Sequence, residues 1–319
     1  MLEVELDIFS GMPNPKWILS RREEGELTER IQAAPEQVSP VSTSEEPFNL
    51  GYRGFIIRVL KEDDGPWSQH QNSVESPLPG EFRVGRAPGL REWSVAQWLL
   101  ETSARRAGVD EELISVASRG VSLPPPLNEE SYPHPSESTI EEQEESETRG
   151  TWFEGEQCSA ANSLYVDNGA LFNQPQNVGN NNCYCFASNY MAGQRYALPG
   201  RYRGRPARDI TVGEIDAGLR ADGWRDSCQS PGGLTIGAAI WPGRDYHFWR
   251  LVSNGNEWLW GHKPGGTPVI YKDRSNWTLK KYVTGAGSYI WMHPESCNRG
   301  EYTVFLGFYY QKNSTAFCS

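Results

Sequence analysis

The pattern of hydrophobic and polar residues predicts two strands within the first 120 residues. Val4, Leu6 and Ile8 are apolar with polar neighbours between them, which predicts a half-buried strand. Residues 51–60, GYRGFIIRVL, predict a second strand. Together with the helices described next, these strands predict a small α+β domain over residues 1–120.

Three segments have the apolar spacing of amphipathic helices. Two of them begin with a capping box, a Ser or Thr followed three residues later by Glu, which satisfies free backbone N–H groups at a helix start. The boxes are Ser20 with Glu23, for a helix over 21–31, and Thr211 with Glu214, for a helix over 211–224. The third segment, 91–108, reads REWSVAQWLLETSARRAG and ends at a glycine.

The composition changes between residues 121 and 150, which are rich in proline, serine and glutamate. Large apolar residues are almost absent there, so this segment cannot bury enough surface to offset the entropy of ordering. It is predicted to be an acidic disordered linker between the first domain and a second one over 151–319.

Four short apolar runs follow the predicted helix 211–224. They are LTIGAAIW (234–241), RDYHFWRLV (244–252), EWLWGHK (257–263) and YTVFLGFYY (302–310). Runs of this length, separated by turn residues, predict an antiparallel sheet. A helix is also expected to begin at Cys183 and to end at Gly193, so the predicted fold class of both domains is α+β.

The dipeptide Asn254-Gly255 predicts a hairpin between two of these strands, because both residues tolerate the positive φ of a type I′ turn. A two-residue turn without a bulge would place His247 directly opposite His262. Directly opposed side chains lie on one face of a sheet, about 5 Å apart at Cβ. The pair is therefore a candidate site, or else a polar rim on a buried sheet.

Charge narrows the range of partners. The net charge is −11, and the predicted linker accounts for most of it, with eight glutamates against one arginine between Asn128 and Gly150. Nucleic-acid binding is therefore not expected. No apolar run is long enough to cross a membrane, and the N-terminus does not read as a secretory signal, so a cytoplasmic chain is the default expectation.

All six cysteines follow the predicted linker, at uneven spacings: Cys158, Cys183, Cys185, Cys228, Cys297 and Cys318. Without an export signal, a reducing compartment is the default, although an even number of cysteines also suits a disulfide framework. Cys183 and Cys185 would lie about 200° apart on a helix, so only one of them can face the hairpin. Cys185 is equally consistent with a small buried hydrophobe.

Cys183 stands where a helix is expected to begin, with two histidines later in the chain. A catalytic cysteine needs a thiol pKa lowered by a helix N-terminus and by an imidazole, because the thiolate is the nucleophile. Asp245, two residues before His247, would share its face as a supporting acid or would simply be solvated. Cys183 is thus a candidate nucleophile, with a core or disulfide cysteine as the alternative.

The motifs Asn182-Cys183-Tyr-Cys-Phe, Asp245-Tyr-His247 and Gly261-His262-Lys-Pro resemble those of bacterial cell-wall cysteine peptidases of the NlpC type. The resemblance covers about residues 175–310, and this chain lacks the usual Asp-Cys-Ser-Gly sequence of that family. It implies a papain-like domain in which a Cys-bearing helix packs on an antiparallel sheet. By this resemblance Cys183 is the nucleophile, His247 the base and His262 the residue that orients the base.

These observations predict a thiol-dependent hydrolase or acyltransferase that acts on an amide or related acyl bond in a peptide-like substrate, without a cofactor. The first domain is then expected to bind a protein partner. A Cys₂His₂ zinc site is an alternative, but Cys-x-Cys is tighter than usual zinc spacings and no metal is expected. Two other hypotheses remain: a non-enzymatic binding protein that uses the aromatic hairpin surface, and a toxin or effector built on the same domain.

Overall fold

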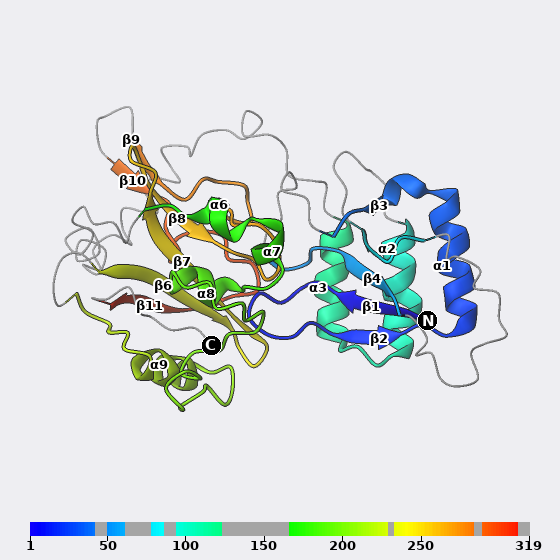
Figure 1. Ribbon diagram of the computed structural model, residues 1–319, viewed down its shortest axis with the longest axis horizontal. Coiled ribbons are helices and arrows are strands. Elements are labelled where there is room, and N and C mark those ends of the chain that lie inside the picture. Colours follow the sequence, from blue (N-terminus) through cyan, green and yellow to red (C-terminus); the bar gives the residue numbers. More distant parts are fainter. Residues whose placement is uncertain are drawn as a thin grey trace. The chain divides into compact units, whose positions relative to one another are not determined.

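The computed structural model describes residues 1–41, 50–60, 78–85, 94–122, 166–228, 233–283 and 289–311 (Figure 1). The chain divides into two units. Unit 1 comprises Met1–Ile8, Asn14–Glu46 and Gly51–Pro125, and unit 2 comprises Phe9–Pro13, Pro47–Leu50 and Pro126–Ser319. Residues 123–150 of the predicted linker lie outside the described residues.

Unit 1 is an α+β unit with an antiparallel sheet of strand order β2-β1-β4-β5-β3. Its elements are β1 (Leu2–Leu6), β2 (Lys16–Ile18), α1 (Arg21–Ala33), η1 (Pro35–Gln37), β3 (Val38–Ser39), β4 (Phe55–Val59), β5 (Glu81–Val84), α2 (Ser94–Trp98), η3 (Leu99–Ala104) and α3 (Glu111–Ser122). The predicted capping box at the start of α1 is confirmed, with the Ser20 and Glu23 side chains each bonded to the other's backbone N–H. The helix expected over 91–108 is interrupted, because η3 is a π-helical turn.

Unit 2 is built on an antiparallel sheet of order β11-β6-β7-β8, as the four apolar runs predict. Its elements are α6 (Gly169–Phe172), α7 (Pro175–Val178), α8 (Cys183–Ala187), α9 (Val212–Ala221), β6 (Leu234–Trp241), β7 (Asp245–Ser253), β8 (Trp258–His262), β9 (Lys281–Val283), β10 (Tyr289–Trp291) and β11 (Val304–Gln311). Strands β9 and β10 pair with each other. Both units are therefore mixtures of helices and antiparallel sheet.

Helix α8 ends at Ala187 and not at Gly193 as the sequence predicts. Asn189 adopts the left-handed conformation, with φ +53°, and such a residue ends a helix. As a result Tyr190 and Met191 are 41% and 43% exposed, and the core-facing helix is only five residues long.

The hairpin between β7 and β8 differs from the predicted register by two residues. His262 lies opposite Trp249 and not opposite His247. The connection is four residues long, since the Asn254 side chain accepts hydrogen bonds from the backbone N–H groups of Asn256 and Glu257. A shift of two residues keeps every side chain on its face, so the two histidines still share one.

Alternation along β7 divides its side chains between the two faces of the sheet. Tyr246, Phe248 and Val252 belong to a hydrophobic core that also contains the side chains of α8. Helix α8 lies against β7 on this side (Figure 1). His247 and Trp249 point to the opposite face.

Candidate functional site

Cys183 is the first residue of α8, and its thiol is fully buried. The Asn182 side chain caps the helix by accepting a hydrogen bond from the Cys185 backbone N–H at 3.2 Å. The Cys183 Sγ lies 3.7 Å from the Tyr246 carbonyl oxygen, to which the thiol donates. Burial, followed by the nearby Asp245 carboxylate, raises the thiol pKa well above its usual value, so the protonated form predominates.

The two histidines of the hairpin are in direct contact. His247 Nε2 and His262 Nδ1 are 2.8 Å apart, and His262 Nε2 is 2.7 Å from the Lys272 carbonyl oxygen. A carbonyl only accepts, so His262 Nε2 carries the proton that is donated to Lys272. Burial lowers the pKa of His262 to about 4, which leaves the ring neutral, and its Nδ1 therefore accepts from His247 Nε2–H.

The structure brings together two of the three predicted site residues. His247 and His262 lie on one face of the sheet, whereas Cys183 packs on the other face against the Tyr246 backbone. The backbone of β7 thus separates the thiol from both imidazoles. In this arrangement neither histidine is placed to accept the thiol proton.

Asp245 has a role that the sequence did not indicate. Its buried carboxylate accepts hydrogen bonds from the backbone N–H groups of Ser10, Gly11 and Met12, at 2.5, 3.0 and 2.8 Å. The Tyr302 hydroxyl donates a fourth at 2.5 Å. Burial raises the pKa of the Asp245 carboxyl, and these four donors oppose that shift by favouring the carboxylate.

This cluster attaches the segment Phe9–Pro13, which lies between β1 and β2 in the sequence, to the sheet of unit 2. The segment contains a glycine and a proline, which are typical of turns, but nothing in its sequence points to a partner more than 230 residues away. Gly11 is required there because a Cβ atom would lie 2.3 Å from the Tyr246 ring. Tyr302 also links the cluster to the histidines, with its ring centroid 5.5 Å from that of His247.

Two tryptophans of the hairpin, Trp249 and Trp260, are buried. Trp249 is fully buried and meets the His247 ring edge-on, with centroids 4.5 Å apart. Trp260 is 2% exposed and packs on Phe308. These two side chains are therefore not open to a ligand.

The described residues do not form the Cys₂His₂ zinc site that was considered as an alternative. Within the described ranges, no three or more His, Cys, Asp or Glu side chains are grouped to hold a metal ion. Cys185 and Cys228 are disulfide-bonded, whereas Cys183 and Cys297 are free and buried thiols. Cys185 is thus not the simple buried hydrophobe that the sequence allowed.

No helix in the part of the chain that the structure describes is long and apolar enough to span a membrane.

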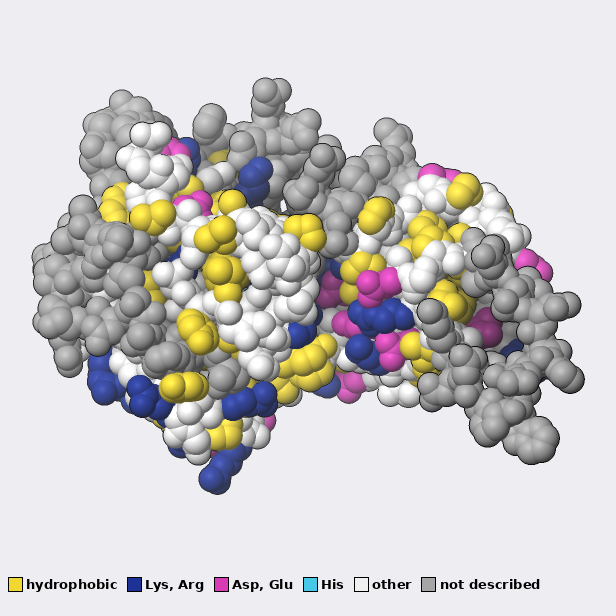
Figure 2. Space-filling view, in the orientation of Figure 1, with side chains coloured by type: hydrophobic (Ala, Val, Ile, Leu, Met, Phe, Trp, Pro, Cys, Tyr) yellow, Lys and Arg dark blue, Asp and Glu magenta, His cyan; other side chains and the backbone are white. Residues whose placement is uncertain are grey.

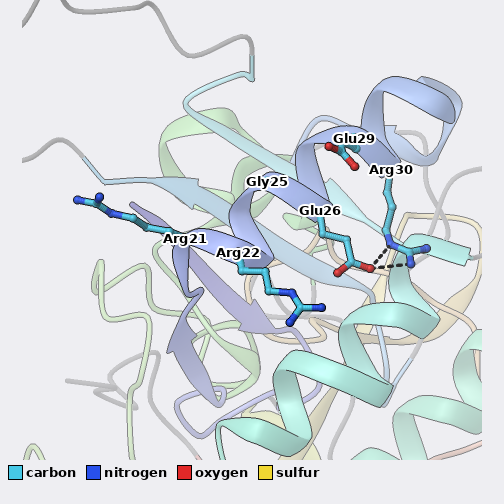
Figure 3. A pocket seen from close by; sticks show the side chains of 6 residues that line it. All are labelled: Arg21, Arg22, Gly25, Glu26, Glu29 and Arg30. Atoms are coloured by element: carbon cyan, nitrogen blue, oxygen red, sulfur yellow. Dashed lines mark hydrogen bonds and ion pairs between the residues drawn. The ribbon is translucent and has the colours of Figure 1, made fainter.

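A pocket of about 500 Å³ lies in unit 1, on the exposed side of α1 (Figure 3). Its lining comes from this one helix: Arg21, Arg22, Gly25, Glu26, Glu29 and Arg30. Arg30 Nη2 is 2.8 Å from Glu26 Oε1, while the Arg21 side chain points away from that pair (Figure 3). This groove has no buried polar group to orient a substrate.

The His262 pKa gives a first prediction. A folded-state pKa of about 4, against 6.5 in the unfolded chain, means that unfolding between these pH values takes up a proton. Stability is therefore expected to fall as the pH drops from 6.5 to 4, by about 3 kcal/mol for this residue. Urea titrations of wild type and His262→Gln at pH 7.0, 5.5 and 4.5 measure the difference.

His293 serves as a matched control, because burial also lowers its pKa to about 4. His293→Gln should remove only the pH dependence of the unfolding free energy that comes from His293. The pH dependence that comes from His262 should remain. If wild type and His262→Gln lose the same free energy of unfolding on acidification, the prediction that His262 is neutral in the folded protein is wrong.

The comparisons with known proteins identify one relative. No family model matches the chain, and no solved structure matches it. Insoluble matrix shell protein 1 of Ruditapes philippinarum is 33% identical over 129 residues, which cover 40% of this chain and 76% of the shell protein. At that identity and coverage the two share a common ancestry, and the chain belongs to the family of insoluble matrix shell protein 1.

Proposed function

We propose that this chain is a non-enzymatic interaction protein of an insoluble matrix. The observation that carries the proposal is the position of Cys183, whose thiol lies across the sheet from His247 and His262. A thiol enzyme needs nucleophile and base within hydrogen-bond reach and needs an accessible thiolate. The position across the sheet opposes the first requirement, and full burial with a raised thiol pKa opposes the second.

The family supports a role in a matrix. The relative is named for an insoluble matrix and for a shell, and the matched region covers three quarters of it. In this chain the His247–His262 pair and Asp245 are then structural. They fix the hairpin and the segment Phe9–Pro13, and neither needs a substrate.

The disulfides support the same function. Cys185 and Cys228 are both bonded, and disulfides persist in oxidising environments such as the extracellular space. This differs from the reducing compartment expected from the sequence. A protein of an insoluble extracellular matrix would meet these conditions.

The thiol-hydrolase hypothesis remains the rival, and it makes an opposite prediction about Cys183. It requires the thiol to leave the core and reach His247 on the other face. Under this hypothesis the protein acts on a peptide-like substrate, and its first domain binds a protein partner. Both of these remain predictions.

Alkylation of the native full-length chain tests the proposal. With iodoacetamide between pH 5 and 9, Cys183 is expected to react at least roughly 100-fold more slowly than an exposed thiol, because only opening of the core exposes it. Peptide mass spectrometry gives the rate at each cysteine. Cys297, also free and buried, is the internal control, and both should react once guanidinium unfolds the chain.

A second arm measures the matrix function directly. Full-length wild type should co-sediment with insoluble polysaccharide particles, and Cys183→Ala should do so equally. Reaction of Cys183 well below pH 8.5, lost in His247→Ala, would instead support the thiol enzyme. Failure of the wild type to sediment with any matrix polymer would overturn the matrix function.

A further inference from the structure

A basic loop joins α8 to α9 in unit 2. Residues 195–208, here called the basic loop, contain five arginines and no acidic residue: Arg195, Arg201, Arg203, Arg205 and Arg208. The chain as a whole carries a net charge of −11, so this loop has the opposite sign of charge from the chain as a whole. On the face of the molecule in Figure 2, Lys and Arg side chains gather around the position of α9.

The basic loop has a defined conformation. The Gly200 carbonyl accepts from the Arg205 N–H at 2.9 Å, and the Arg201 carbonyl accepts from the Gly204 N–H at 3.1 Å. The Gly200 N–H donates to the Asp222 carboxylate at 2.6 Å, and that carboxylate also accepts from the Tyr184 hydroxyl. The backbone of the loop is thus attached to the core before any partner binds.

Its tip is exposed and carries charge and an aromatic ring together. Arg201, Arg203 and Arg208 are exposed, and Tyr202 is 47% exposed. The Arg203 guanidinium lies over the Tyr202 ring, 5.5 Å from its centroid. Arg201 and Arg208 make no side-chain ion pair with any residue that the structure describes.

The neighbouring carboxylates that form ion pairs bind Arg205 and Arg220, although Glu214 and Asp222 also interact electrostatically with Arg208 and Arg203. Glu214 binds Arg205 through both oxygens, at 2.8 and 3.0 Å. Asp216 and Asp226 both bind Arg220 at 2.8 Å. Arg201 and Arg208 therefore lie outside the ion pairs that the described residues of this region form.

We infer that the basic loop binds an anionic polysaccharide, through Arg201, Arg203 and Arg208 on its carboxylate or sulfate groups and through Tyr202 on a sugar ring. This inference rests on the proposed matrix function and names the partner class and the site. Guanidinium groups match planar or tetrahedral oxyanions by paired N–H donors. Clustered Arg residues are also typical of heparin-type binding patches.

The tyrosine favours a sugar polymer over an acidic peptide. An exposed flat ring presents an apolar surface beside the charges, which suits the apolar face of a pyranose ring. The proposed matrix function favours a matrix polymer over a nucleic acid, which is also a polyanion and meets the same net charge of −11. An acidic peptide and an oligonucleotide therefore serve as competing probes.

Binding of the full-length chain to polygalacturonate and to heparin, measured by biolayer interferometry at 50 and 300 mM NaCl, tests the inference. The triple variant Arg201→Gln/Arg203→Gln/Arg208→Gln should bind about tenfold more weakly, because three exposed ion pairs are lost. Tyr202→Ala should weaken binding by a factor that persists at 300 mM NaCl, since stacking is not screened by salt. Neutral dextran should not bind.

A charge-matched control uses exposed arginines of unit 1, Arg21→Gln/Arg22→Gln/Arg105→Gln, and should keep wild-type affinity. Equal loss in both triple variants would overturn the assignment of this loop in favour of a net-charge effect. Equal or tighter binding of poly-glutamate or of a single-stranded oligonucleotide would overturn the choice of partner. Sedimentation with matrix particles that survives the loop substitutions overturns only this inference, whereas a wild type that never sediments overturns the matrix function itself.

Discussion

Asp245→Ala is expected to lower the free energy of unfolding of unit 2 by at least about 3 kcal/mol. The carboxylate accepts from three backbone N–H groups, those of Ser10, Gly11 and Met12, and from the Tyr302 hydroxyl. Removing it leaves buried donors without an acceptor, and each such donor costs about 1–3 kcal/mol, although neighbouring losses do not simply add. Urea titration with hydrogen–deuterium exchange of β6 and β7 peptides measures the change.

Tyr302→Phe is the matched control, because it removes one donor and leaves the carboxylate with three. It is expected to cost about 1–2 kcal/mol. Exchange should also rise in residues 9–13 for Asp245→Ala, since their N–H groups lose a buried acceptor. If Asp245→Ala costs no more than Tyr302→Phe, the carboxylate does not hold the segment Phe9–Pro13 in place.

Gly200→Ala should be nearly as severe, with a loss of about 3 kcal/mol. Gly200 has φ +82°, a left-handed conformation, and a Cβ atom there would lie 1.9 Å from the Arg205 carbonyl oxygen. It would also lie 2.9 Å from the Gly218 Cα of α9. Both contacts are with backbone, so the loop and the helix would have to separate. The same urea titration measures the loss.

Gly204→Ala separates backbone strain from crowding. Gly204 also has positive φ, +72°, but nothing lies within 4 Å of its would-be Cβ. Its substitution should cost only about 1 kcal/mol, from backbone conformation alone. Equal costs for the two variants would contradict the close packing of the basic loop on α9.

The hairpin illustrates what could be predicted about the site. The sequence correctly places β7 and β8 and puts His247 and His262 on one face, although the register differs by two residues. The two histidines still share a face because strand side chains alternate with a period of two residues, and the predicted register was wrong by two residues. The four-residue connection came from the Asn254 side chain, whose hydrogen bonds compete with the two-residue turn.

Cys183 illustrates what could not be predicted. The sequence places it correctly at a helix start, and the structure shows that Asn182 caps this helix. It does not say on which face of the sheet that helix packs, because packing of α8 depends on Tyr246 and Phe248, which flank His247 and point the other way. A motif order of Cys, His, His is compatible with either face.

The sequence by itself determined the local features of this protein: the capping box of α1, the four apolar strands and the shared face of the two histidines. Each depends on side-chain periodicity or on contacts within a few residues, which the order of amino acids states directly. Only the tertiary structure decided that Cys183 is separated from His247 and that Asp245 holds residues 9–13. Those outcomes depend on which surfaces pack together, and packing joins residues more than 230 positions apart through volume and hydrogen bonding that no local pattern encodes.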